Sequence, residues 1–276
     1  MFIQEFYKMF TRSYAFIALL VIFVLMLLFG LSFTVEGGSY YNSFVSTFGK
    51  GVEFNGKLVN GNMFAYQLLH ALWLFVPLLI VFVTGGMISE EKSEGVLRMI
   101  LARPVSKTKF FTARFMAAIL YVFIVVVLMA VLSVGIGLLV FGNGELLVFD
   151  KGNFTVLSPN AALIRFAVAY AYYTVVLFTV ASLSMLFSVI FQNSLKAVMV
   201  TVSVILSLYF ITSLDIAMFD GLKPFLFTSY FSTWSRFFAV NIHWMNFAFD
   251  IIVLSIHILV FYVLAVVLFN KKEIYN

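Results

Sequence analysis

Long runs of apolar residues without a charge are the dominant feature of the chain. The first extends from Tyr14 to Thr34, and five others follow it. A helix needs about 20 apolar residues to cross a bilayer, whereas the strands of a membrane barrel would alternate apolar and polar residues. The continuous runs therefore predict an all-α integral membrane protein with a single transmembrane domain, 1–276. Its six spans are expected at 14–34, 67–89, 110–141, 161–191, 197–214 and 250–270.

The segment before the first span, 1–13, has an amphipathic pattern instead. On a helical wheel its apolar residues share one arc and its polar residues the other. This pattern predicts an interfacial helix in the plane of the lipid head groups; the alternative is that its cations only orient the first span. The apolar arc holds Phe2, Ile3, Phe6, Met9 and Phe10, and the polar arc holds Gln4, Glu5, Lys8, Thr11 and Arg12.

The composition agrees with a protein of the lipid bilayer and narrows its chemistry. The chain is 63% hydrophobic and has a mean hydropathy of +1.09. It has no cysteine, which excludes disulfides, thiolate catalysis and cysteine-based metal sites. The net charge of +5 does not indicate nucleic-acid binding, because excess Lys and Arg normally orient a membrane protein and no basic stripe is interleaved with aromatic residues.

The distribution of Lys and Arg predicts the orientation. If the six spans alternate in direction, eleven of the 17 Lys and Arg lie on the side of the two termini. Because cytoplasmic loops carry this excess, both termini of this multi-pass protein of the cytoplasmic membrane are expected in the cytoplasm. The eleven are Lys8, Arg12, Lys92, Arg98, Arg103, Lys107, Lys109, Arg114, Lys196, Lys271 and Lys272.

The loop between spans two and three, 90–109, gathers charge that the rest of the chain avoids. From Glu94 its apolar residues form a stripe, Pro104 must end the helix, and Ser106 can cap the next one. The pattern predicts a short helix across the base of the membrane. An apolar stripe favours docking into a groove of a partner protein; the alternative is an ordinary positively charged loop. The stripe is Val96, Leu97, Ile100 and Leu101.

This loop resembles that of the type-2 ATP-binding-cassette (ABC) permeases, whose pattern is roughly E-x-x-E-G-T-L-x-x-L-L-x-x-P-V-S-R. Val96 stands where that pattern usually has Thr. The amphipathic N-terminus, the six spans and the long segment between spans five and six are also similar, although these features are generic. The matching residues are Glu91, Glu94, Gly95, Val96, Leu97, Ile100, Leu101, Pro104, Val105, Ser106, Lys107 and Arg114.

The resemblance implies a function and partners. The loop would be a cytoplasmic coupling helix docked on a separate ATPase subunit, and substitution of Gly95 or Pro104 would uncouple ATP hydrolysis from transport. Two ATPase copies would bind the ATP and Mg, and a second permease chain, identical or similar, would complete the pathway. A hydrophobic or amphipathic compound would be exported. The docking residues would be Glu91, Glu94, Gly95, Val96, Leu97, Arg98, Ile100, Leu101 and Pro104.

Other candidate residues lie outside this loop. Gln192, Asn193 and Lys196 form a second cytoplasmic contact by the same resemblance, or a plain turn between helices. In the outer segment, Tyr230 and Trp234 belong to an aromatic series at helical spacing that Thr228 or Ser229 could cap. This series indicates short helices that dip partway into the membrane, or an aromatic belt at the membrane interface. The resemblance to the permeases implies that such re-entrant helices would close the pathway.

Two histidines, His70 and His257, lie nearer the hydrocarbon. Intramembrane ionisable residues are functional candidates, but a lone histidine more often forms a hydrogen bond between helices. The two are therefore candidates for the transport pathway, with a structural hydrogen bond as the alternative.

Catalysis by the chain itself is not expected. Residues 51–58, GVEFNGKL, have the spacing of a phosphate-binding loop, but Leu58 replaces the Ser or Thr that ligates magnesium. No zincin or nucleophile-elbow motif occurs. The alternative function is an ion-coupled secondary transporter without an ATPase partner, which would need a coupling-ion site near the midplane; no Asp or Glu is expected in the core of a span.

Overall fold

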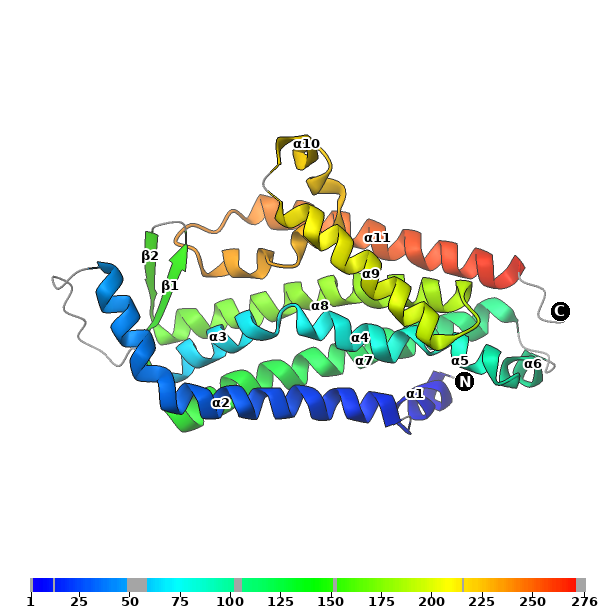
Figure 1. The fold of residues 1–276 in the computed structure, drawn as a ribbon, viewed down its shortest axis with the longest axis horizontal. Coiled ribbons are helices and arrows are strands. Elements are labelled where there is room, and N and C mark those ends of the chain that lie inside the picture. Colours follow the sequence, from blue (N-terminus) through cyan, green and yellow to red (C-terminus); the bar gives the residue numbers. More distant parts are fainter. Residues whose placement is uncertain are drawn as a thin grey trace.

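The computed structural model describes residues 2–11, 13–48, 59–101, 106–150, 153–214 and 216–271, which form an elongated bundle of helices (Figure 1). Five helices are long and apolar enough to cross a membrane, and a bent pair would be a sixth. The chain is therefore mostly helical, as expected for a membrane protein of this class.

The helices follow the apolar runs of the sequence, with some differences at their ends. The helices are α1 (Phe2–Thr11), α2 (Ser13–Phe48), α3 (Gly61–Leu72), α4 (Phe75–Gly85), α5 (Ser89–Ser93), α6 (Val96–Leu101), α7 (Lys107–Ile136), α8 (Pro159–Ile190), α9 (Ser194–Ser213), α10 (Ala217–Asp220) and α11 (Trp244–Lys271), and a π-helical turn (Gly137–Phe141) extends α7.

Helix α8 is the central helix of the bundle. In its most apolar window 78% of the residues are buried, compared with 11% in α11 and 22% in α2 and α9. It packs against α4, α7, α9 and α11. The outer helices keep apolar side chains exposed, which suits a surface covered by lipid.

The two ends of the bundle differ in what they carry. Helices α1, α5 and α6 and the last turn of α11 lie at one end, which we call the base (Figure 1). The opposite end, which we call the far end, carries a two-stranded antiparallel hairpin. Both ends of the described chain lie at the base (Figure 1).

The second apolar run differs from the continuous helix expected at 67–89. It begins earlier, at Gly61, and α3 and α4 meet at a bend of 53° around Trp73. Pro77 explains the break, because it has no N–H to bond the carbonyl oxygen of residue 73 and its ring crowds that carbonyl. The hydroxyl of Tyr173 in α8 donates to this oxygen at 2.8 Å instead.

A short β-hairpin between α7 and α8 adds to the otherwise helical fold. Strands β1 (Leu146–Asp150) and β2 (Asn153–Leu157) pair antiparallel, with Leu146 opposite Leu157. Two apolar runs separated by two residues, one of them glycine, are a hairpin signal in a sequence. Asn60, which caps α3, also fixes the start of the hairpin. Its Nδ2 donates to the carbonyl oxygen of Glu145, the residue just before β1, at 2.7 Å.

The segment between α9 and α11 consists of short helices. After α10 it forms three 3₁₀ helices, Lys223–Phe225, Phe227–Tyr230 and Thr233–Phe238, and none of the three has a side-chain cap. Ser229 Oγ donates to the Lys223 carbonyl oxygen at 2.5 Å, so it fastens the segment to itself rather than capping a helix. Most of its aromatic side chains are buried, which argues against a simple belt at the membrane surface; these are Phe227, Tyr230, Phe231, Trp234, Phe237 and Phe238.

Candidate functional site

A buried ion network lies at the base and joins three segments that are far apart in the sequence. Arg114, two turns inside α7, is almost fully buried. Its Nε donates to Glu5 of α1 at 2.8 Å, and its other nitrogens donate to the Glu91 carboxylate of α5 and to the Met87 carbonyl oxygen. Lys8 of α1 also pairs with Glu91. We call Glu5, Lys8, Glu91 and Arg114 the Arg114 network.

The network balances two carboxylates with two cations, which is what allows Glu91 and Arg114 to be buried. The guanidinium of Arg114 also lies 4.7 Å from the centre of the Phe110 ring, a cation–π contact. The polar arc of α1 therefore contacts the protein as well as its surroundings, which the amphipathic pattern alone did not predict. The network fixes α1 and α5 to α7.

Helix α5 is also fixed to the end of α8. Ser188 Oγ accepts hydrogen bonds from the backbone N–H groups of Ile88 and Ser89, both at 3.0 Å. Lys92 Nζ donates to the Val189 carbonyl oxygen. Two long helices, α7 and α8, thus hold the segment that enters the predicted coupling loop.

Gly95 separates α5 from α6 at the base. Its φ of 72° lies in the left-handed region, which only glycine adopts without strain. On α6, Leu97 is 1% exposed and Met99 is 67% exposed, so the helix keeps one apolar residue inside and presents another. Ser106 caps α7 as expected, because its hydroxyl accepts from Lys109 N at 3.2 Å.

The burial of two predicted docking residues changes their interpretation. Glu91 and Leu97 are both buried in this chain, and the Glu91 carboxylate pairs with Arg114 and Lys8. Glu94 is exposed and Val96 is half-buried. The side chains of Arg98, Ile100 and Leu101 lie outside the described part of the chain, as do Pro104 and the 51–58 loop.

The structure brings the second predicted contact next to the first. Asn193 caps α9 by accepting from Leu195 N at 2.8 Å, and the side chains of Gln192 and Lys196 are exposed. Together with Lys92 and Ser93 they line one shallow hollow of about 580 Å³ at the base. The two loops thus share one surface.

The predicted pathway residues fall into two aromatic clusters. Trp234 is buried against α3, with its ring 5.9 Å from His70 and 5.8 Å from Tyr66. His70 itself is exposed. Tyr230 is buried and donates to the Pro224 carbonyl oxygen at 2.5 Å; burial, followed by the nearby Asp250 carboxylate, raises the pKa of its phenol, so the hydroxyl remains a donor at neutral pH.

His257 belongs to the second cluster. Its ring lies 5.9 Å from Phe227 and 5.8 Å from Phe261, and its Nδ1 bonds the Val253 carbonyl oxygen at 2.8 Å within α11. This hydrogen bond lies within one helix and does not join two helices.

A buried carboxylate in α11 was not expected. Asp250 is 5% exposed, and the Tyr172 hydroxyl of α8 lies 3.5 Å from its Oδ2. A sequence signal existed, because an acidic residue six positions into an apolar helix needs a partner. Among the residues that the structure describes, no three His, Asp or Glu side chains are grouped to hold a metal ion.

Comparison with known proteins identifies the family but no activity. The chain is 24% identical to the uncharacterized protein YhcI of Bacillus subtilis (strain 168) over 209 aligned residues. These residues make up 74% of this chain. The chain spans 66% of the length of that relative, just under two thirds. Residues 18–275 match a family described as a protein of unknown function, DUF2705. Because this match covers nearly the whole chain, the protein belongs to the DUF2705 family.

Proposed function

We propose that this chain is the membrane-spanning permease subunit of an ATP-driven transporter and exports a hydrophobic or amphipathic compound. A separate ATPase subunit would hydrolyse the ATP and dock on α6 from the cytoplasm. Two permease chains, identical or similar, and two ATPase subunits would form the complete transporter. The resemblance of the 90–109 loop to type-2 ABC permeases supports this proposal.

One observation carries the proposal furthest. Helix α5 is held to α7 and α8 by the Arg114 network and by Ser188, whereas α6 follows a glycine turn and presents Met99. A movement of α6 would therefore be transmitted through α5 to α7 and α8, because ion pairs and hydrogen bonds hold α5 to both of these helices. A simple connecting loop would not need such an attachment.

The far half of the bundle offers elements that could change the pathway. The bend between α3 and α4 gives the second span a joint within the apolar region. Trp234 packs against α3 just before this joint. If the base moves α4, the motion could pass through this joint to α3 and loosen its contact with the aromatic segment that contains Trp234.

The first test is purification of the tagged chain in mild detergent and identification of what accompanies it. A stoichiometric subunit with a complete phosphate-binding loop is expected. Met99→Glu should reduce its recovery at least about ten-fold, because a charge would enter an apolar contact at a cost of about 1.4 kcal/mol or more. Met218→Glu, at an exposed methionine of α10, should not change it. Equal recovery with both variants would exclude docking on Met99.

Gly95→Ala tests whether the turn transmits motion. Alanine meets no atom within 4 Å there, so only the left-handed backbone opposes it, at a cost of about 1–2 kcal/mol. We expect the assembled complex to keep its ATPase rate but to transport at least about five-fold less compound per ATP. The control is Gly221→Ala, in open space with a φ of −68°. Wild-type coupling in the assembled Gly95→Ala complex would contradict the proposed role.

An ion-coupled secondary transporter remains the second candidate, and Asp250 favours it. A buried carboxylate that faces a tyrosine of the central helix is the kind of group that binds a coupling ion or proton. Transport by the purified chain alone in liposomes, driven by an ion gradient and lost in Asp250→Asn, would support this candidate over the first.

A further inference from the structure

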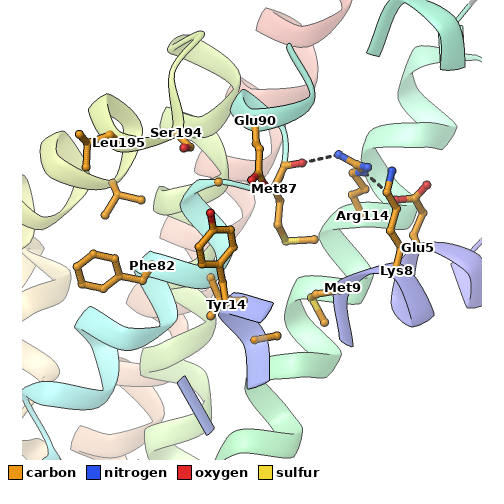
Figure 2. A pocket seen from close by; sticks show the side chains of 14 residues that line it. Glu5, Lys8, Met9, Tyr14, Phe82, Met87, Glu90, Arg114, Ser194 and Leu195 are labelled. Atoms are coloured by element: carbon orange, nitrogen blue, oxygen red, sulfur yellow. Dashed lines mark hydrogen bonds and ion pairs between the residues drawn. The ribbon is translucent and has the colours of Figure 1, made fainter. Parts of the chain in front are cut away.

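A pocket of about 220 Å³ opens at the base beside the Arg114 network (Figure 2). It lies between α1, the start of α2, the end of α4, α5, α7 and the start of α9. The Arg114 network explains only one wall of this space. The pocket itself has no part in the proposed docking of an ATPase.

The pocket lies at the level where the candidate spans begin or end, which is the boundary between lipid and water. Tyr14 is the first residue of the first candidate span, and Ser194 is the first residue of another. Glu90 lies in the last turns of the bent span that ends at Ser93. All three line the pocket. Lipid head groups occupy this level of a bilayer.

The walls of the pocket change from apolar to charged across its width. Phe82 and Leu195 lie on one side and are 55% and 63% exposed, as lipid-facing residues are. Glu5, Lys8 and Arg114 lie on the other side, and Glu90 lies between the two (Figure 2). A ligand that fits this arrangement has a charged head and an apolar body that leaves past Phe82 and Leu195.

The size of the pocket limits which part of such a ligand it encloses. Pockets that bury a drug-sized molecule usually measure about 300–1,000 Å³, and one water needs only about 10–15 Å³. A space of about 220 Å³ therefore suits a head group, with the acyl chains remaining in the bilayer.

The charges of the lining select the kind of head group. Lys8 is 42% exposed and can add a phosphate oxygen to its contacts, since an ammonium has three donors. The lining holds two carboxylates, Glu5 and Glu90, and two cations, Lys8 and Arg114, so a purely anionic head would leave the Glu90 side of the pocket unmatched. A head with both a phosphate and a cation satisfies both kinds of wall, and a primary ammonium can donate hydrogen bonds to Glu90, which a quaternary one cannot.

We propose that this pocket binds the head group of a zwitterionic phospholipid with a primary ammonium, the chemistry of phosphatidylethanolamine. The phosphate lies toward Lys8 and the ammonium lies against Glu90. The bound lipid fills the space between α1, α4 and α9 at the base. This inference requires only that the chain is a membrane protein, and it does not depend on the proposed transport function.

Native mass spectrometry of the purified full-length chain tests the proposal. The protein is titrated with phosphatidylethanolamine, phosphatidylcholine and phosphatidylglycerol of the same acyl chains. We expect phosphatidylethanolamine to bind at least about five-fold more tightly than either of the others. Equal binding of the three lipids, or a preference for phosphatidylglycerol, would overturn the proposal.

Two variants locate the site. Gly86→Leu adds bulk to the lining without strain, because its backbone is helical and a Cβ would lie 3.6 Å from Ser194 Cβ and 3.9 Å from Glu90 Oε2. It should reduce the preferred binding at least about five-fold, whereas Gly135→Leu, which adds the same side chain in open space on α7, should not. Glu90→Gln should bring the three lipids to similar affinities. An unchanged preference in either pocket variant would exclude this site.

Discussion

Replacing Arg114 by methionine is expected to lower the free energy of unfolding by about 3–5 kcal/mol. Methionine keeps an unbranched apolar stem but leaves the buried carboxylate of Glu91 without its guanidinium partner. Arg114→Lys should recover only part of the loss, because one ammonium cannot reproduce the guanidinium fork that reaches Glu5, Glu91 and the Met87 carbonyl oxygen.

Chemical unfolding in detergent micelles, followed by circular dichroism, measures this effect. The matched control is Lys109→Met, which removes an exposed cation from the same helix and should change the free energy of unfolding by less than about 0.5 kcal/mol. The double variant Arg114→Met with Glu91→Met should be more stable than Arg114→Met alone, since it removes both buried charges. Equal effects at Arg114 and Lys109 would show that the network does not stabilise the base.

The second large effect is expected at the far end, where Gly61→Ala should cost about 3 kcal/mol of unfolding free energy, near the upper end for an overpacked site. A Cβ on Gly61 would lie 2.4 Å from the backbone carbonyl of Gly137, and a Cβ on Gly137 would lie 2.5 Å from the Gly61 carbonyl oxygen. Both neighbours are backbone atoms, which cannot avoid the added methyl group by a change of rotamer as a side chain can. The start of α3 and the π turn after α7 would have to separate.

Gly135 provides the control for this contact, because a Cβ there meets nothing within 4 Å. Gly135→Ala should be neutral or should stabilise α7 by about 0.5–1 kcal/mol. Thermal melting and chemical unfolding of the three alanine variants give the comparison. If Gly61→Ala and Gly137→Ala have the same melting temperature as Gly135→Ala, the close approach of the two backbones is not required for stability.

The location of the apolar helices was predictable from the sequence because a membrane imposes a simple rule. Each span must satisfy its own backbone in a helix and expose apolar side chains to lipid, so its pattern is local. The cap by Ser106 was predictable for the same reason, since donor and acceptor lie three residues apart. The hairpin at 146–157 is local too, since its two strands are separated by only two residues.

The break near Trp73 shows where local rules stop. Pro77 made a break predictable in principle. The hydrogen bond that makes the break tolerable comes from Tyr173, 100 residues away, and no local pattern identifies such a partner. The spacing of apolar and polar residues in α1 likewise predicted an amphipathic helix, but not that Glu5 and Lys8 would face two charges from other helices.

The sequence by itself determined the membrane class, the approximate position of each apolar helix, the charge bias between the two sides and the unusual loop at 90–109. Only the tertiary structure decided that Glu91 and Leu97 of that loop point inward, that the two polar turns share one surface, and that Arg114 joins α1 to α5. The reason is physical: apolar spans depend on residues next to one another in the chain, whereas burial of a charge depends on which distant partner packing brings within a few ångströms.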